Sequence, residues 1–273
     1  TDPDADRLGV YAKDSKTGEY KSFTGHMSGL LIADYILNQK REQNKLPENG
    51  AIVKTIVSSN MAKEIAKEYK LHLVEVLTGF KYIGEQIKIF EENKKYQYLF
   101  GYEESYGCLL GTYARDKDGI AAVMSLCEVA CFAKMNNKTL CDIMLEMYEK
   151  YGYYKEDLVF FTLKGIEGSK KIKETMENLR NNPLKNIGQE KIIAIRDYLI
   201  SERTEIETGK KEKINIPTSN VLYYELEENG WFCVRPSGTE PKIKIYIGIK
   251  DNNLEKANSK LESLKSEILK LLK

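Results

Sequence analysis

The sequence predicts an α/β fold in which a βαβ-type domain with a mixed or parallel sheet precedes an α+β domain with an antiparallel sheet and helices. Two observations lead to this prediction. Strand-like and helix-like runs alternate through the middle of the chain, whereas several strand-like runs follow one another in its last third. Because 273 residues exceed the usual size of one domain, we divide the chain into segments 1–47, 48–164 and 165–273.

The first segment, 1–47, is predicted to contain one strand and one helix after an acidic loop. The apolar run 8–13 predicts the strand, and apolar side chains at helical spacing predict a helix over 25–42. The polar stretch 42–50, "EQNKLPENG", ends this helix and marks a boundary, because Pro, Asn and Gly favour loops.

The central segment, 48–164, alternates between strands and helices, which is typical of βαβ units around a parallel sheet. The predicted strands are 51–57, 71–76 and 96–102, and the predicted helices are 61–69, 82–93, 119–135 and 140–152. Asp118 is expected to cap the third of these helices. Ligands of such sheets bind beyond the carboxyl ends of the strands, where "TGFK" (78–81) and "GYEESYG" (101–107) fall.

The last segment, 165–273, is predicted to pack helices on an antiparallel sheet. A helix over 165–183 precedes strands at 191–200, 221–227, 231–237 and 242–249. A terminal helix follows, with apolar residues at helical spacing: Leu254, Ala257, Leu261, Leu264, Ile268 and Leu271. The stripe is short for a coiled coil, so packing on the sheet is the preferred interpretation.

The composition favours small-molecule partners. Lys plus Arg number 42 and Asp plus Glu 41, so no strong field draws the chain to nucleic acid or to an acidic membrane surface. No apolar run reaches the roughly 18 residues of a membrane span. The five cysteines form no C-x-x-C pair and are predicted to be buried, reduced thiols. Because reduced thiols are typical of the cytoplasm and no signal sequence is visible, we expect a cytoplasmic protein.

The motif "TDPDADR", residues 1–7, places Asp2, Asp4 and Asp6 beside Arg7. Three carboxylates on a short loop can converge on Mg²⁺ or Ca²⁺, which prefer oxygen ligands. An EF-hand is excluded, because Arg7 and Lys13 stand where that loop needs Gly and Glu. A solvated turn in which Asp6 pairs with Arg7 is the alternative.

The motif "GYEESYG" places Glu103, Glu104 and Ser105 between glycines after a strand. Carboxylates and hydroxyls bind sugar hydroxyls well, so a sugar-binding loop is one interpretation. A glycosidase pair is disfavoured, because its two carboxyls come from separate elements held about 5 Å or about 6.5–9.5 Å apart. A surface turn is the other interpretation that stays open.

The motif "RDKDG", residues 115–119, sets Lys117 among acidic residues just before a helix. A lysine in this position is a candidate general acid or base if its neighbours tune its pKa, or a ligand for phosphate. A charged entry to the helix is the alternative.

The motif "RPSGTEPK", residues 235–242, lies between two strands and has the chemistry of a phosphate cradle. It offers a guanidinium, two hydroxyls, an ammonium and a glycine that lets backbone N–H groups turn inward. The pattern of a Walker loop is absent. A hairpin turn fixed by Pro236 and Pro241 is the alternative.

In this order the five motifs closely resemble the α-D-phosphohexomutases, the phosphoglucomutase and phosphomannomutase superfamily. The Glu-Glu-Ser form of the sugar loop is most similar to bacterial phosphoglucomutases. The family moves a phosphoryl group between the 1- and 6-positions of a hexose phosphate through a bisphosphorylated sugar. The resemblance therefore implies Mg²⁺ and glucose 1,6-bisphosphate as cofactors and a hexose phosphate as substrate. It also implies that segment 1–47 is the end of domain two, segment 48–164 is domain three and segment 165–273 is domain four.

The resemblance also implies roles for individual residues. Asp2, Asp4 and Asp6 would bind Mg²⁺, with Arg7 beside the phosphoserine of the complete enzyme. Lys117 would be the general acid or base, and Lys81 of "TGFK" would make a further contact in the active site. The residues that bind substrate would be Glu103 and Ser105 at the sugar and, at the phosphate that is not transferred, Arg235, Ser237, Gly238, Thr239 and Lys242.

The phosphorylated serine of this family, in a loop of the Thr-Ala-Ser-His-Asn-Pro type, has no match in the chain. His26 and His72 lack a preceding serine and are predicted to lie at a helix start and on a strand. We therefore expect the later half of a four-domain enzyme, without turnover of its own and with the missing N-terminal part as its partner. A non-catalytic sugar-phosphate-binding protein and a mannose or pentose specificity are the alternatives. A phosphatase would need an aspartate nucleophile, and the order of the motifs disfavours it.

Overall fold

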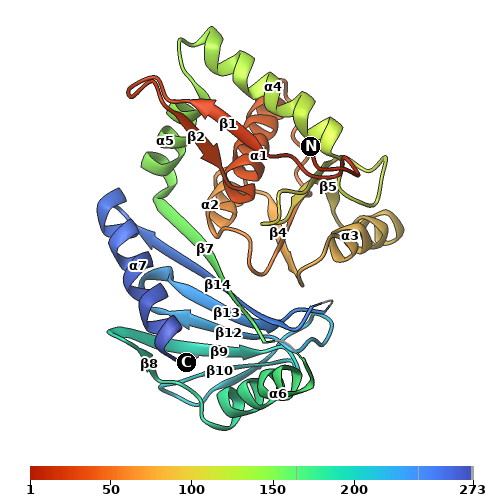
Figure 1. Ribbon diagram of the computed structural model, residues 1–273. Coiled ribbons are helices and arrows are strands. Elements are labelled where there is room, and N and C mark those ends of the chain that lie inside the picture. Colours follow the sequence, from red (N-terminus) through yellow and green to blue (C-terminus); the bar gives the residue numbers. More distant parts are fainter. Residues whose placement is uncertain (164, 239, 272–273) are drawn as a thin grey trace. The chain divides into compact units, whose positions relative to one another are not determined.

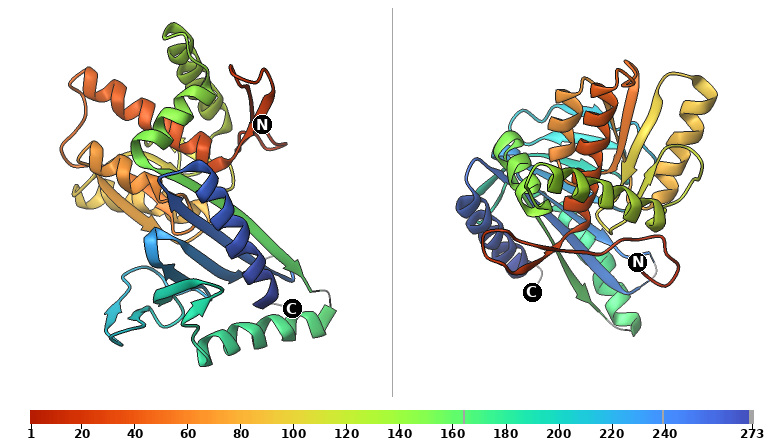
Figure 2. Two further views of the ribbon diagram at one scale, coloured as in Figure 1. Left: turned by 90° about the vertical axis from the view of Figure 1, so that its left-hand side faces the viewer. Right: turned by 90° about the horizontal axis from the view of Figure 1, so that it is seen from above.

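The computed structural model describes residues 1–163, 165–238 and 240–271 (Figure 1 and Figure 2). The chain divides into two compact units, Thr1–Gly152 and Tyr153–Lys273. The boundaries at 47/48 and 164/165, which rest on sequence patterns, stay a prediction.

The first unit is built around a four-stranded mixed sheet with the strand order β4-β3-β5-β6. β3 runs parallel to β4 and β5, and β6 is antiparallel to β5. Every residue of β3 is buried, as expected for a strand that is covered on both faces. The predicted βαβ arrangement is confirmed, with these strands: β3 Gly50–Thr55, β4 His72–Val76, β5 Gln97–Tyr102 and β6 Cys108–Leu110.

Helices pack on both faces of this sheet: α1 Gly25–Glu42, α2 Met61–Glu68, α3 Phe80–Asn93, α4 Gly119–Met135 and α5 Leu140–Tyr151. A register shift between β3 and β5 makes Leu99 an extra residue in β5. The residues before and after it therefore face opposite sides. Tyr98 joins Phe90 of α3 in one hydrophobic cluster, whereas the Tyr102 ring lies against Gly29 of α1.

A side-chain cap fixes the start of α4. The Asp118 carboxylate accepts hydrogen bonds from the backbone N–H groups of Ile120 and Ala121, both at 2.9 Å. These bonds satisfy two of the donors that the first turn of a helix leaves free. The predicted cap is confirmed, and the predicted bounds of α1 and α4 are correct to the residue.

A two-stranded antiparallel ribbon precedes α1 in the first unit. It consists of β1 Val10–Lys13 and β2 Tyr20–Phe23, so the strand expected over 8–13 begins two residues later. The acidic loop of residues 1–7 leads directly into this ribbon.

The second unit is an antiparallel sheet with the order β11-β10-β9-β12-β13-β14-β7, with β8 paired to β9. Its strands pair in an antiparallel manner throughout the described residues, which confirms the predicted antiparallel sheet. The strands are β7 Tyr153–Thr162, β8 Asn186–Ile187, β9 Glu190–Asp197, β10 Glu202–Glu205, β11 Lys211–Lys213, β12 Leu222–Leu226, β13 Trp231–Pro236 and β14 Lys242–Asp251.

Two helices pack on one face of this sheet, α6 Gly165–Asn181 and α7 Leu254–Leu271, and a short 3-10 helix, η1 Glu227–Asn229, precedes β13. Met176 of α6 and Leu264 of α7 belong to the same buried cluster as alternate residues of β12, β13 and β14, such as Phe232 and Ile245. The terminal helix thus packs on the sheet as predicted, rather than forming a coiled coil.

β7 is the largest element that the sequence patterns missed. It pairs with β14 over its whole length, from Tyr153 opposite Asp251 to Thr162 opposite Lys242. Its sequence, "YYKEDLVFFT", carries three charged residues in a row, and Phe160 is exposed although it is apolar. No clean period-2 pattern therefore marks it, and its long partner strand stabilises it instead.

The cysteines differ in burial, although all five are free thiols. Cys108 and Cys233 are buried as expected, but Cys127 and Cys131 lie exposed on α4. They are exposed because α4 is apolar around its whole circumference, and a single face of it packs inward. Among the described residues no single helix has the length and composition of a membrane span, although α4 and α5, bent by 86°, pass that test as a pair.

Candidate functional site

The acidic loop at residues 2–6 gathers its three carboxylates. Oxygens of Asp2, Asp4 and Asp6 lie within 4.8 Å of one another. The turn is made by Ala5, which has a positive φ of 57° and donates its N–H to the Asp2 carbonyl at 3.0 Å. Asp6 Oδ1 is buried and makes no hydrogen bond within the described part of the chain, although Arg7 Nε lies 3.6 Å from it. Three hard oxygen donors with one of them unsatisfied fit a divalent cation such as Mg²⁺.

Arg7 closes the same loop from the other side. Its backbone N–H donates to Asp2 Oδ1 at 3.1 Å and its Nε donates to Asp2 Oδ2 at 2.6 Å. Desolvation acts to raise the pKa of Asp2, but the hydrogen bonds from Arg7 outweigh it and lower that pKa to about 2. Asp2 is therefore a carboxylate at any ordinary pH.

Lys117 reaches this loop from the turn before α4. Its Nζ lies 2.9 Å from Asp6 Oδ2 and 3.0 Å from Asp116 Oδ1, and its side chain is 14% exposed. Desolvation acts to lower the pKa of Lys117, but the hydrogen bonds to Asp6 and Asp116 hold it above its ordinary value. The group is thus a charged proton donor beside the carboxylates.

Two glycines let the loops of the first unit approach each other. Gly119 donates its N–H to the Ala5 carbonyl at 3.0 Å, and a Cβ at this position would lie 2.5 Å from that oxygen. A Cβ on Gly107 would overlap the methylenes of Lys117. Leu8 N–H also bonds the Tyr106 carbonyl at 3.1 Å. The motifs "TDPDADR", "GYEESYG" and "RDKDG" therefore form one site in space.

The loop after β5 presents its two glutamates in different directions. Glu103 is 6% exposed, and its backbone N–H bonds the Gly107 carbonyl at 2.9 Å. Burial and the neighbouring Glu104 charge raise the pKa of Glu103, against a hydrogen bond from Ser105 and the charge of Lys117. Glu104 instead accepts a hydrogen bond at 2.9 Å from Thr55 Oγ1, at the end of β3.

The loop after β3 is part of this site, and the sequence analysis missed it. Thr55 Oγ1 also lies 2.9 Å from Ser58 Oγ, and the fully buried Lys54 donates to the carbonyls of Thr55 and Ser58 at 3.1 and 2.9 Å. Lys54 further pairs with Glu75 at 3.0 Å. Polar residues directly after a buried strand, in "KTIVSSN", were the available signal.

In the motif "TGFK", Phe80 lies close to Lys117, and the role of Lys81 stays a prediction. The exposed Lys81 places its Nζ over the Tyr82 ring, 4.8 Å from the centroid, and makes no hydrogen bond or ion pair with the described residues. Phe80 instead lies beside Lys117, whose Nζ is 5.6 Å from the ring centroid. The histidines lie where expected, His26 at the start of α1 and His72 at the start of β4.

The second unit carries the remaining predicted residues in the turn between β13 and β14. Arg235 is half-buried near the end of β13, Ser237 donates its N–H to the Lys242 carbonyl at 2.8 Å, and Gly238 is exposed. Lys242 Nζ pairs with Glu240 at 2.8 Å. Thr239 lies outside the described residues. β13 and β14 pair up to Pro236 opposite Ile243, and the Arg235 guanidinium and the Lys242 ammonium come from the ends of these two strands. The role of these residues in phosphate binding stays a prediction.

Two family descriptions match the chain in sequence. Residues 24–151 match phosphoglucomutase/phosphomannomutase, alpha/beta/alpha domain III, and residues 205–257 match the phosphoglucomutase/phosphomannomutase C-terminal domain. A phosphoglucomutase of Staphylococcus aureus is 37% identical over 264 residues, which are 97% of this chain and 46% of that protein. The chain thus spans about half the length of the curated relatives it matches.

Solved structures agree in fold. The phosphoglucomutase parafusin from Paramecium has a TM-score of 0.66 at 18% identity, over 98% of this chain and 44% of that one. The N-acetylphosphoglucosamine mutase of Aspergillus fumigatus, solved with GlcNAc-6P and magnesium, has a TM-score of 0.53 at 14% identity, over 99% and 48%. The two domain matches and the S. aureus relative identify the chain as a member of the phosphoglucomutase/phosphomannomutase family, the α-D-phosphohexomutases.

Proposed function

We propose that this chain supplies the metal loop, the sugar loop and a phosphate-binding loop of a Mg²⁺-dependent phosphoglucomutase. The reaction would interconvert glucose 1-phosphate and glucose 6-phosphate through glucose 1,6-bisphosphate. Because the chain spans 46% of its curated relative, the activity belongs to a longer protein or assembly that contains it.

One observation carries this proposal. Lys117 lies between the metal loop and the sugar loop, with its Nζ 2.9 Å from Asp6 and its methylenes packed against Gly107. A phosphoryl transfer between sugar hydroxyls needs a cation site and a proton carrier at the same oxygen. Surface turns with unrelated functions would not bring these groups together.

The residues divide the chemistry between them. Asp2, Asp4 and Asp6 would hold Mg²⁺, which neutralises charge on the phosphoryl group in transfer. The Lys117 ammonium would donate its proton to the sugar oxygen that loses the phosphoryl group, and the neutral amine would take a proton from the hydroxyl that accepts it. Arg7 would stabilise the negative charge of the phosphoryl donor.

Each unit would carry substrate-binding residues. Glu103 and Ser105 would accept and donate hydrogen bonds at the sugar hydroxyls, while Thr55 holds Glu104 away from them. The other phosphate would be bound by the turn between β13 and β14, through Arg235, Ser237, Gly238, Thr239 and Lys242. Lys242 would exchange Glu240 for that phosphate.

The phosphoserine that donates the phosphoryl group would come from outside this chain. We expect no turnover from the 273 residues alone. A cytoplasmic location fits the free thiols and remains part of the proposal.

The experiment compares binding with turnover. Calorimetry on the 273-residue chain with Mg²⁺ and glucose 1,6-bisphosphate should show binding of both, without conversion of glucose 1-phosphate. The longer protein that includes the upstream residues should turn over. Binding without turnover in the longer protein would favour the alternative of a non-catalytic sugar-phosphate-binding protein, and absence of binding would contradict both. Turnover assays with mannose and ribose phosphates as competing substrates then show which sugar phosphate the longer protein prefers.

Variants of the longer protein separate the roles. Lys117→Met should lower kcat by about 10²–10⁴-fold with KM little changed, as expected for a general acid or base. Arg235→Ala should raise KM for glucose 1-phosphate by about tenfold or more, because a charge-assisted contact is lost. Lys213→Ala, an exposed change in the same unit, is the control and should alter neither.

A further inference from the structure

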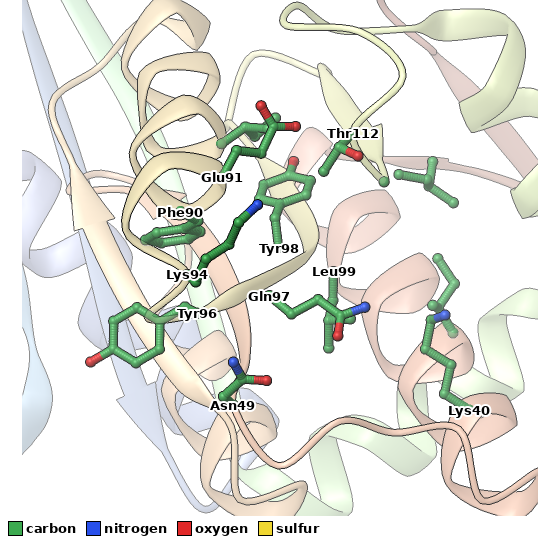
Figure 3. A pocket seen from close by; sticks show the side chains of 14 residues that line it. Lys40, Asn49, Phe90, Glu91, Lys94, Tyr96, Gln97, Tyr98, Leu99 and Thr112 are labelled. Carbon is green, nitrogen blue, oxygen red and sulfur yellow. The ribbon is translucent and has the colours of Figure 1, made fainter.

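The first unit contains a cavity of about 610 Å³ at the end of the sheet opposite to the candidate active site (Figure 3). Asn49, just before β3, and Gln97, the first residue of β5, line it, as does Leu110 at the end of the antiparallel β6. The active-site loops instead follow the carboxyl ends of β3 and β5. The cavity is therefore separate from the site that the family shares.

The floor of this cavity is apolar and rigid. Phe90, Tyr98 and Leu99 line it and are each 5% exposed. The Tyr98 hydroxyl donates to the Leu109 carbonyl at 3.0 Å, so this polar end is already satisfied and its ring is left to line the cavity. Buried side chains fixed in this way form a preformed surface for an apolar or aromatic group.

The walls carry an excess of positive charge. Lys40, from the last turn of α1, and Lys94, which follows α3, stand on different sides of the floor, and Lys94 extends toward the Tyr98 ring (Figure 3). Neither ammonium has a hydrogen bond or ion pair within the described part of the chain. Glu91 is the acid among the lining residues, and Arg115 Nη2 neutralises it at 2.5 Å.

We propose that this cavity binds a small organic anion with an aromatic or apolar body. Its volume lies within the roughly 300–1,000 Å³ of small-molecule sites. The body of the ligand packs on Phe90, Tyr98 and Leu99, and its anionic group accepts a charge-assisted hydrogen bond from Lys40 or from Lys94. Gln97 and Asn49 supply further amide groups at the rim. The inference is independent of the proposed mutase activity.

A matched pair of probes tests the proposal on the full 273-residue chain. Fluorescence titration compares 1-anilinonaphthalene-8-sulfonate with the neutral N-phenyl-1-naphthylamine, which has the same aromatic body without the sulfonate. The sulfonate should bind saturably and at least tenfold more tightly. The double variant Lys40→Gln/Lys94→Gln should lose about tenfold or more of this affinity, because it removes both ammonium groups that can contact the sulfonate. Lys67→Gln/Lys88→Gln removes two exposed lysines outside the cavity and should have no effect.

Amide NMR spectra locate the probe, with shifts expected within residues 36–40, 87–99 and 110–112. If the double variant fails to fold by circular dichroism, Gln97→Glu replaces it, since this isosteric change adds a negative charge at an exposed position on the rim. It should weaken binding of the sulfonate but not of the neutral probe. Equal affinities for both probes, unchanged affinity in the variants, or shifts confined to other segments such as α4 would overturn the proposal.

Discussion

Replacing Lys54 by Met should destabilise the first unit and leave the second unchanged. Lys54 is fully buried in β3, where its Nζ bonds the carbonyls of Thr55 and Ser58 and pairs with Glu75 at 3.0 Å. Methionine has a similar shape, so the variant loses these polar contacts without leaving a large cavity.

The expected loss of unfolding free energy follows from the polar groups that Lys54→Met leaves without a partner. The Thr55 carbonyl keeps a hydrogen bond from Ser58 N–H, and Glu75 keeps Lys63 at 3.4 Å, but the Ser58 carbonyl loses its bond from Lys54. Breaking a buried ionic contact costs about 3–5 kcal/mol, and the retained partners place the expected loss at the low end, about 3 kcal/mol. With a urea m-value of about 2 kcal/mol/M, the midpoint should fall by about 1.5 M.

Two spectroscopic probes separate the units in one experiment. Trp231 is the single tryptophan, lies buried in the second unit and stacks on Tyr223, so its fluorescence reports unfolding there. Circular dichroism at helical wavelengths includes the first unit and should show the shifted transition. Lys63→Met, which removes an exposed partner of Glu75, is the control and should shift the midpoint by less than about 0.3 M. Equal shifts for both variants, or a shifted tryptophan transition, would refute the reasoning.

Three further results are expected. Hydrogen bonds from Arg7 lower the pKa of Asp2 to about 2, so this ligand stays a carboxylate over the whole ordinary pH range. Mg²⁺ affinity measured by calorimetry should therefore be constant between about pH 5 and 8, and a midpoint near pH 6 would contradict this. Burial and the Lys54 charge lower the pKa of His26 to about 3, so its ring ¹⁵N signals should stay those of a neutral imidazole above about pH 5. In the unfolded chain the same imidazole takes up a proton near pH 6.5, so the free energy of unfolding should decrease below that pH. A titration of His26 near pH 6.5 in the folded protein would argue against its burial. Gly107→Ala should lower the free energy of unfolding, measured with urea, by about 1–3 kcal/mol, because the new methyl group overlaps the Lys117 side chain. Gly9→Ala, with open space around it, is the control and should lower this free energy by less than about 1 kcal/mol. Equal losses for both variants would disprove the contact.

Local signals in the sequence were sufficient for most elements. The bounds of α1 and α4 were predicted to the residue, since helical spacing and, for α4, the Asp118 cap are encoded by neighbouring residues. β7 was missed because its stabilisation comes from β14, far along the chain. Three charged residues interrupt the alternation of apolar and polar residues in β7, and its strand conformation is explained by its pairing with β14.

The sequence predicted the motifs that form the candidate site, but it did not predict the contacts between them. Oxygen chemistry and spacing predicted the convergence of the three aspartates, and the structure brings them within 4.8 Å, while their role as Mg²⁺ ligands stays a prediction. That Phe80 rather than Lys81 lies beside Lys117, and that Thr55 holds Glu104, depends on how separate loops meet. Such contacts join residues that are distant in sequence, so no local pattern encodes them.

The pairing of β7 with β14 has a consequence for the order in which the protein is made. β7 is the first strand of the second unit to leave the ribosome, and β14 is the last, so this pairing must wait until the chain has been synthesised through Asp251. The first unit is complete before then and can fold during translation. In the interval β7 is an unpaired strand with exposed Leu158 and Phe160. We therefore expect the nascent chain to be prone to aggregation while its second unit emerges.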